Sequence, residues 1–257
     1  MPITTNTNTE SLSRFVISLA DDSLVLGQRL TELCSRAPYL EEDLAISNVA
    51  LDYIGRASML YTYAAELRGD GCTEDDIAFF RDERQYTNLL INELPNGDFA
   101  FTLLKQYYLD VFNCLYLEKL TLSTDQTLSA IAVKTLKESR YHLKRSIPWI
   151  RQLAGGTNES LERLELAMEE LQSFLGEMFA MLDWETQLAN QEIAVDRASL
   201  LVPWEAQVST LFNECGLTYT NIELKIKGGR DGIHTEHLGH LLTELQFVQR
   251  SHPGLKW

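Results

Sequence analysis

The feature that most constrains the fold of this chain is a series of long helical segments joined by short connections. Hydrophobic spacing, with proline and glycine at the breaks, predicts long helices over residues 11–36, 41–69, 99–121, 124–153 and 158–188. A helix of about 25 residues spans about 37 Å. Several helices of this length with short connections form a bundle, so the predicted fold class is all-α.

Shorter segments complete the prediction. Thr73 and Asp76 have the spacing of a capping box, and Asp98 follows a Pro-Asn-Gly turn as an N-cap. We expect a disordered tip over 1–10, a core bundle over about 11–190, and a C-terminal extension over about 191–257 within one domain 11–257. The extension is expected to hold short helices over 203–216 and 234–250, with a loop or short hairpin over 218–232.

The charge balance excludes some partners. The 257 residues carry a formal net charge of -15 and 45% hydrophobic residues. Nucleic acids and anionic membrane surfaces attract basic patches, so neither is expected as a partner. The four cysteines form no Cys-x-x-Cys motif, and no secretory signal or stretch of about 18 apolar residues is seen. We therefore expect a cytoplasmic location.

The most informative motif is an incomplete metal-ligand pattern. Di-iron helix bundles carry Glu-x-x-His on two helices and one acid on each of two others. Here Glu138 is followed at the third position by Tyr141, and His142 comes one residue later. One residue rotates a side chain about 100° around a helix, so His142 is not expected to aim where the missing histidine would.

A second predicted helix also lacks a histidine at the expected ligand position. The segment 44–65 contains only two charged residues, Asp52 and Arg56, which predicts a central, buried helix. Asp52 stands at the acid position and Gly55 at the histidine position. Asp110, in an aromatic stretch, is the candidate single acid of a further helix. Asp52, Gly55, Asp110, Glu138 and Tyr141 are thus interpreted as vestigial ligand positions.

Ordinary polar contacts explain the same residues without a metal. Arg56 lies one turn from Asp52 and can pair with it. Glu138 has Lys134, Arg140, His142 and Arg145 as possible partners. An iron pair needs about six protein ligands, including two imidazoles, and this chain supplies three acids. The prediction is a filled cavity with no metal, with Arg56 and His142 as compensating partners.

Other motifs are weaker. His234, His237 and His240 have a spacing that could hold zinc, but no cysteine is near, and capping or interface contacts are favoured. The glycine-rich segment 228–232 lacks the spacing of a phosphate-binding loop, and no nucleophile motif is present. No catalytic or cofactor-binding residue is assigned.

Seven short segments carry a resemblance that runs from the first predicted helix to the last. They are Leu24-Val-Leu-Gly-Gln-Arg-Leu30, Leu51-Asp-Tyr-Ile-Gly55, Arg81-Asp-Glu-Arg-Gln85, Pro95-Asn-Gly-Asp-Phe99, Lys137-Glu-Ser-Arg-Tyr-His-Leu143, Ile193-Ala-Val-Asp196 and His234-Thr-Glu-His-Leu-Gly239. With them the chain resembles the ferritin-like, non-catalytic C subunits of ring-1,2-phenylacetyl-CoA epoxidases from bacterial phenylacetate degradation.

The resemblance implies a division of labour. A catalytic sister subunit of the same ferritin-like fold would hold the di-iron centre and oxygenate the aromatic ring, and a reductase and further small subunits would complete the complex. This chain would pair with the sister subunit as a scaffold and carry no cofactor. Two alternatives stay open, namely a divergent di-iron oxygenase with its own unusual ligands and a stand-alone helical ligand-binding protein.

Overall fold

The computed structural model describes residues 4–255, and within this range it contains helices and connecting segments but no β-strand. The all-α prediction is confirmed. The segment 218–232 forms a loop ending in a 3-10 turn and contains no hairpin strand. None of the helices described is both long enough and apolar enough to cross a membrane.

The chain divides into two compact units. The first comprises residues 1–95 and 228–257, and the second comprises 96–227. The expected core (11–190) and extension (191–257) are thus divided differently, since residues 191–227 belong to the second unit and the last helix belongs to the first. The expected disordered tip falls partly outside the described residues, and helix α1 already begins at Thr4.

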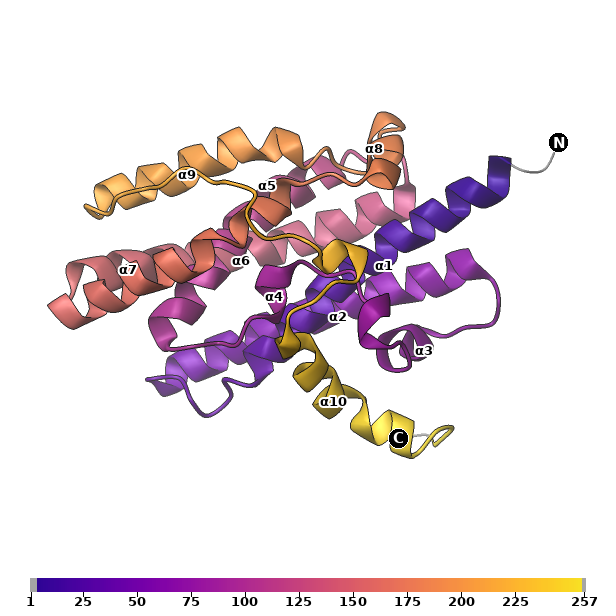
Figure 1. Cartoon of the computed structure of the whole chain (residues 1–257), viewed down its shortest axis with the longest axis horizontal. Helices are drawn as coiled ribbons and strands as arrows, with labels where there is room; N and C mark the ends of the chain where they lie inside the picture. The colour runs from indigo at the N-terminus through magenta and orange to yellow at the C-terminus, as the bar shows by residue number, and fades with distance from the viewer. Residues whose placement is uncertain (1–3, 256–257) are drawn as a thin grey trace. The chain divides into compact units, whose positions relative to one another are not determined.

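In the first unit two long helices lie side by side and run in opposite directions (Figure 1). Short helices and a 3-10 turn follow them, and the chain returns to this unit for its last helix. The elements are α1 (Thr4–Thr31), α2 (Leu40–Arg68), α3 (Glu74–Phe79), η1 (Glu83–Gln85), α4 (Leu90–Glu93), η4 (Gly229–Asp231) and α10 (Glu236–Ser251).

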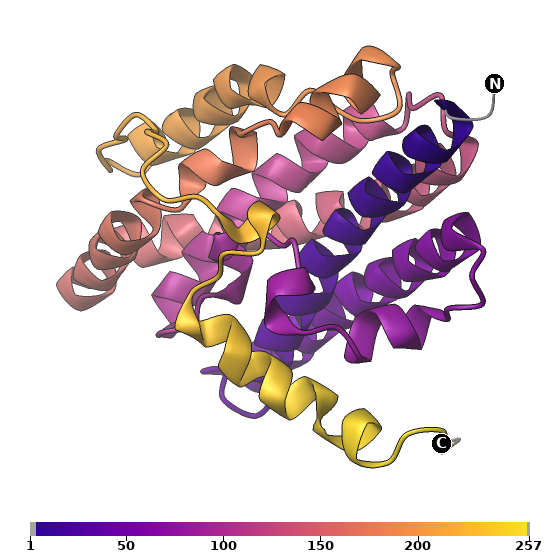
Figure 2. The ribbon, with the colours of Figure 1, turned by 45° about the vertical axis from the view of Figure 1, so that its right-hand side comes forward.

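The second unit is built around the pair α5 and α6, which lie side by side in Figures 1 and 2. Helices α7 and α9 pack on this pair. The elements are α5 (Phe99–Leu120), α6 (Gln126–Gly155), α7 (Asn158–Gln172), η2 (Leu175–Phe179), α8 (Asp183–Asn190), η3 (Ala198–Leu200) and α9 (Leu201–Glu214).

Local signals set several helix ends where the sequence predicted them. Thr73 and Asp76 form the capping box that opens α3, and the Asp98 carboxylate accepts the Phe101 amide at the start of α5. Gly69 ends α2 in the left-handed conformation, at φ 61°.

The prediction that the segment 44–65 is a central, buried helix is wrong. The long helix that is buried nearly all round is α5. In α5 only Glu118 and Lys119 are exposed. Helix α2 instead exposes an uncharged line of side chains at helical spacing. This line, called the α2 stripe, consists of Leu40, Leu44, Asn48, Leu51, Gly55, Ser58 and Thr62. The low charge of the segment 44–65 predicted burial correctly for the face opposite the stripe, but it wrongly predicted burial for the stripe itself.

The predicted long helix over 158–188 is also wrong, because α7 ends at Gln172. The loop 217–227 crosses the chain here, and the Ile226 amide donates to the Ser173 carbonyl at 3.2 Å. At Gly176, an added Cβ would lie 2.6 Å from the Glu223 carbonyl oxygen. The close crossing of two backbones therefore requires glycine at this position.

We predict that Gly176→Ala destabilises the protein by about 1–3 kcal/mol, because the new methyl group would overlap backbone that cannot move freely. Urea unfolding followed by circular dichroism measures the change. Gly155→Ala is the matched control, since no atom lies within 4 Å of its Cβ position. Equal stability of the two variants would contradict the prediction.

Candidate functional site

The predicted site residues on α2 do not face the interior of the first unit. Asp52 is half-buried, and Gly55 is exposed with no atom within 4 Å of its Cβ position. The buried side chains three residues apart are Tyr53 and Arg56, and the Arg56 guanidinium lies 4.9 Å from the Tyr53 ring centroid. The ion pair between Asp52 and Arg56 stays a prediction.

Helix α6 in the second unit shows the same displacement by one residue. Glu138 is half-buried and Tyr141 is 58% exposed, whereas His142 is only 1% exposed. The buried line on this helix contains Thr135, Ser139, His142 and Ser146. Positions 55 and 141 therefore do not face the interior of their units.

Asp110 is fully buried on α5, and neutral donors contact both of its carboxylate oxygens. The Gln106 amide donates to Oδ1 at 2.6 Å, and the Ser146 hydroxyl of α6 donates to Oδ2 at 2.8 Å. Hydrogen bonds of this kind make the burial of a polar group tolerable without a metal.

These residues do not fit an iron pair. The buried side chains at ligand spacing are Tyr53 with Arg56 and Ser139 with His142, which supply one imidazole and a cation where anionic ligands are needed. Among the residues that the structure describes, no group of three or more His, Cys, Asp and Glu side chains could hold a metal ion. The absence of a metal from this chain stays a prediction.

Sequence analysis missed a buried ionic cluster in the first unit. Asp21 of α1 is fully buried and forms an ion pair with Arg81. Its carboxylate also accepts the Tyr61 hydroxyl at 2.6 Å and the Thr87 amide at 2.8 Å. The only local signal was a pair of adjacent acids, Asp21 and Asp22, within a predicted helix, since the partners of Asp21 lie 40 to 66 residues away.

The cluster keeps its tyrosines neutral. Burial, followed by the charge of Asp21, raises the pKa of Tyr61 well above its ordinary value. Burial also raises the pKa of Tyr86, whose ring lies 4.2 Å from the Arg81 guanidinium carbon, to about 12. The cluster thus joins one carboxylate, one guanidinium and neutral hydroxyl donors, and it ties the segment after α3 to α1 and α2.

A second buried pair fixes the last helix to the same unit. His234 Nδ1 lies 3.0 Å from Glu93 Oε2, and its Nε2 lies 3.0 Å from the Tyr86 carbonyl oxygen. The Thr235 amide donates to Glu93 Oε1 at 2.8 Å. Both ring nitrogens face acceptors, so the geometry favours the doubly protonated imidazolium.

The charge of His234 follows from its surroundings. Burial lowers the pKa, but the hydrogen bond to Glu93 and the charge of that carboxylate raise it more, with smaller contributions from the Tyr86 carbonyl and from Glu83. The net pKa lies above the ordinary value of 6.5. This contact, and not zinc binding, accounts for the imidazole of His234, while Thr235 caps α10.

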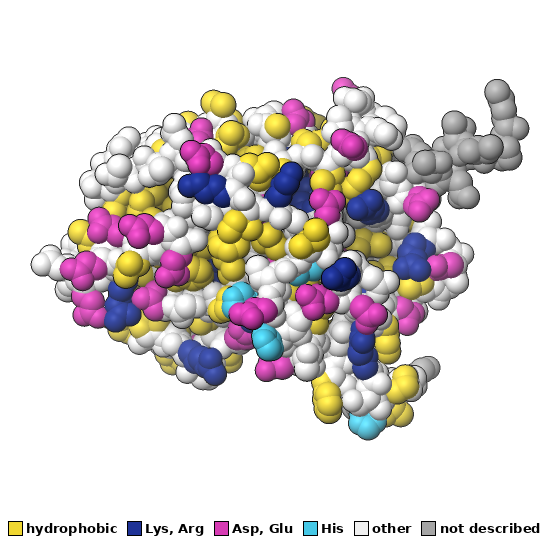
Figure 3. Space-filling view, viewed as in Figure 1, with side chains coloured by type: hydrophobic (Ala, Val, Ile, Leu, Met, Phe, Trp, Pro, Cys, Tyr) yellow, Lys and Arg dark blue, Asp and Glu magenta, His cyan; other side chains and the backbone are white. Residues whose placement is uncertain are grey.

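Arg29 of α1 and the polar side chains of α10 extend this attachment. The Arg29 guanidinium donates to the Glu93 carbonyl at 2.9 Å and to the His237 carbonyl at 2.8 Å. Gln246 of α10 donates to the Arg81 carbonyl at 2.9 Å. The last helix also leaves hydrophobic side chains exposed, drawn in yellow in Figure 3, and Phe247 is 66% exposed.

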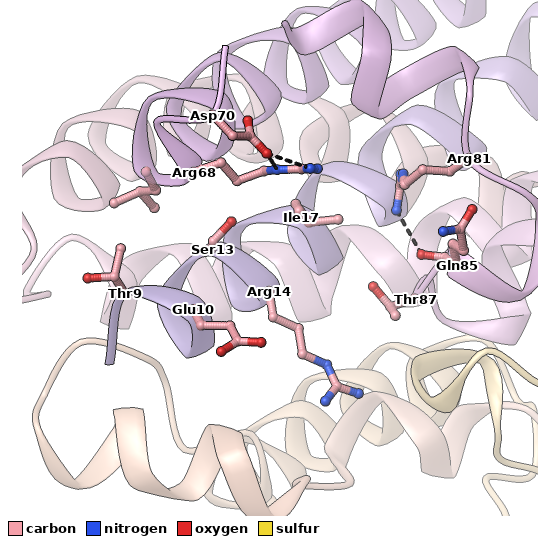
Figure 4. Close-up of a pocket in the computed structure, with 11 residues that line it drawn as sticks. Thr9, Glu10, Ser13, Arg14, Ile17, Arg68, Asp70, Arg81, Gln85 and Thr87 are labelled. Carbon is pink, nitrogen blue, oxygen red and sulfur yellow. Dashed lines mark hydrogen bonds and ion pairs between the residues drawn. The ribbon is translucent and has the colours of Figure 1, made fainter. Parts of the chain in front are cut away.

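A pocket of about 510 Å³ in the first unit adjoins the Asp21 cluster (Figure 4). Arg14, Arg68 and Arg81 line it, together with Glu10 and Asp70. Arg68 is paired with Asp70 at 2.9 Å, and Arg81 is paired with Asp21. At least two of the three cations thus have carboxylate partners, and the carboxylate of Glu10 also lines the pocket.

The fold defines an all-α protein built from long helices. Comparison with known proteins gives the family. The sequence profile of the family described as Phenylacetic acid catabolic protein matches residues 3–257, and the chain belongs to that family. The chain is 43% identical to the C subunit of the 1,2-phenylacetyl-CoA epoxidase of Escherichia coli (strain K12), over 96% of this chain and 99% of the relative. The resemblance seen in the sequence is confirmed.

We predict that Asp21→Asn destabilises the protein by about 3–5 kcal/mol, because the Arg81 charge would remain buried without its carboxylate. Thermal or urea unfolding measures the loss. Asp82→Asn is the control, because Asp82 pairs with Arg250 in an exposed contact and should change stability by less than about 1 kcal/mol. A loss below about 1 kcal/mol for Asp21→Asn would refute the importance of this cluster.

We also predict a pH dependence for the His234 contact. A raised folded-state pKa means that stabilisation is complete below pH 6.5 and is lost as the pH rises through the folded-state pKa. The stability difference between the native chain and His234→Gln should be about 1.5–3 kcal/mol at pH 6 and should shrink by pH 9. Exposed His240→Gln is the control, and a difference that grows with pH would contradict the prediction.

Proposed function

We propose that this chain is a non-catalytic scaffold subunit of a phenylacetyl-CoA epoxidase, which pairs with a catalytic subunit that holds the di-iron centre. Near full-length similarity to the C subunit of such an enzyme supports membership of the complex. The misfit of the buried polar residues to an iron pair supports placing the chemistry in another subunit. In this proposal the chain carries no cofactor.

The observation that carries the pairing proposal is the α2 stripe. It runs over about six turns of α2 and contains no charged residue, although 23% of the chain is charged. Leu44 is 57% exposed and Leu51 is 63% exposed. A solvated helix face normally carries charges, whereas an uncharged face with exposed leucines is typical of a surface that another protein covers.

The stripe is also shaped for close contact with a helix. Gly55 and Ser58 are small, and the space above Gly55 is open. A helix of the partner could therefore approach this part of α2 closely, with the leucines on the N-terminal side packing against its apolar side chains. Obligate contacts between subunits bury roughly 2,000 Å² or more.

The chemical role that follows is preorganisation. When a rigid surface packs against the catalytic subunit, it can hold the helices that carry the iron ligands in position, through the residues behind those ligands. This chain would then affect the iron site without touching substrate. The buried ionic contacts of Asp21 and Glu93 support the role, because they stiffen the unit that contains α2.

We predict that the double variant Leu44→Glu, Leu51→Glu folds normally but associates with the catalytic subunit at least about 100-fold more weakly. Two unpaired carboxylates would have to be buried, and about 3 kcal/mol corresponds to a factor of about 100. Coexpression of the two chains followed by size-exclusion chromatography measures the association. Leu166→Glu is the control, since Leu166 on α7 is similarly exposed at 57%.

Iron counting in the same preparations separates the alternatives. The scaffold proposal expects iron in the catalytic chain and none above background in this chain expressed alone. About two iron atoms bound to the isolated chain would support a divergent oxygenase instead. A stable free chain that never associates with the catalytic subunit would support a stand-alone ligand-binding protein.

A further inference from the structure

Positive charge is concentrated on one helix of this acidic chain. Helix α6 contains six of the 22 basic residues and only one of the 37 acids. Its formal charge of +5 contrasts with the net charge of -15 for the whole chain, which leaves -20 for the remaining residues. Helix α6 therefore carries a net positive charge within an otherwise acidic chain.

Exposed residues in the middle of α6 form a single line. It comprises Lys134, Lys137, Arg140, Tyr141 and Lys144, all of them exposed, and is called the α6 basic stripe. At about 100° per residue these five positions fall within about 120° of the helix circumference. The stripe is about 15 Å long, at 1.5 Å per residue.

The spacing within the stripe is unfavourable for the isolated helix. Lys134 and Lys137, Lys137 and Arg140, and Arg140 and Lys144 are like-charged pairs three or four residues apart. Such pairs destabilise a helix, whereas alternating signs would stabilise it. A solvated face would therefore be expected to mix acids with these residues.

Within the described residues, neither Lys137 nor Lys144 has an ion-pair partner, whereas Arg140 lies 3.1 Å from Glu118 in an exposed ion pair. Tyr141 lies between the two lysines on the same face and is largely exposed. An exposed tyrosine flanked by unpaired cations has the composition of a binding surface, because tyrosine provides contact area at low entropic cost.

The shape of the α6 basic stripe limits the classes of ligand that it can bind. Small molecules bind in concave pockets that enclose most of their surface, and the outer face of a helix is convex. Anionic membranes and nucleic acids would be repelled by the charge of -20 on the rest of the chain. An acidic surface on another protein avoids both objections, because it can present its charges to the stripe alone.

We propose that the α6 basic stripe docks an acidic face of another protein chain of the same enzyme, with Lys137 and Lys144 pairing with carboxylates on either side of Tyr141. The contact is sensitive to salt, since exposed charges are screened over about 8 Å at physiological ionic strength. The proposal rests on the proposed function, because it requires that the chain works in a complex.

Zero-length crosslinking of the assembled enzyme tests the contact directly. A carbodiimide joins a lysine amine to a carboxylate only where they touch, and mass spectrometry then identifies both residues. Crosslinks from Lys137 or Lys144 to Asp or Glu of another subunit are the expected result. Absence of any crosslink between chains from either lysine overturns the proposal, as do crosslinks only to a second copy of this chain.

Charge reversal gives the second measurement. Lys137→Glu with Lys144→Glu should weaken binding of the crosslinked subunit at least tenfold, and raising NaCl from 50 to 300 mM should weaken binding of the unaltered chain. Lys225→Glu with Lys227→Glu makes the same change of charge on the exposed loop of the second unit and should leave binding intact. Equal losses for both variants would indicate a general effect of net charge and overturn the proposal.

Two further outcomes are distinguished in the same experiments. If coenzyme A alone protects Lys137 and Lys144 of the isolated chain from acetylation, the stripe binds a small polyanion and the proposal fails. If pairing through the α2 stripe is observed but the α6 crosslinks are absent, the proposed function stands and only this inference fails. If no complex forms at all, both fail.

Discussion

The first unit depends on one fully buried carboxylate. Asp21 lies on the buried face of α1, where an unpaired charge would be too costly to bury. Arg81, Tyr61 and Thr87 together satisfy it, and so they fix where the irregular segment after α3 must lie. Glu93, further along the same segment, then meets His234 and positions the last helix. The placement of α3, η1, α4 and α10 thus follows from two buried acids, which also stiffen the helix that carries the α2 stripe.

The fold class was predictable from the sequence because long helices leave local signals. Thr73 with Asp76, Asp98 and Gly69 are short-range features, and each acts as predicted. Orientation around the helix axis was harder. In the segment 44–65 of α2 only Asp52 and Arg56 are charged, so no polar face marked which side would be exposed. In α6 the spacing of Leu128, Ala132 and Ile150 already marked the buried face, and Ser139 and His142 lie on the same line. The incomplete ligand motif instead placed the ligand position at Tyr141, one residue away from that line.

The remaining features could not be read from local patterns. Asp21 meets Arg81 across 60 residues, and His234 meets Glu93 across 141 residues. No periodicity encodes such pairs, because they depend on which segments the fold brings together. The end of α7 has the same origin, since it depends on a loop some 50 residues later that crosses at Gly176. Contacts with other proteins are harder still to predict from sequence. The α2 stripe and the α6 basic stripe can be recognised only when the burial of each helix face is known.

The path of the chain through its two units has a consequence for biosynthesis. The second unit is one continuous stretch, 96–227, and can complete its contacts while translation continues. The first unit is discontinuous, so the contact between His234 and Glu93 must wait for residues 228–257. Domains usually fold in the order in which they leave the ribosome, but here the unit that begins first is completed last. A premature stop codon just before His234 would therefore damage the N-terminal half of the protein more than the segment next to the truncation.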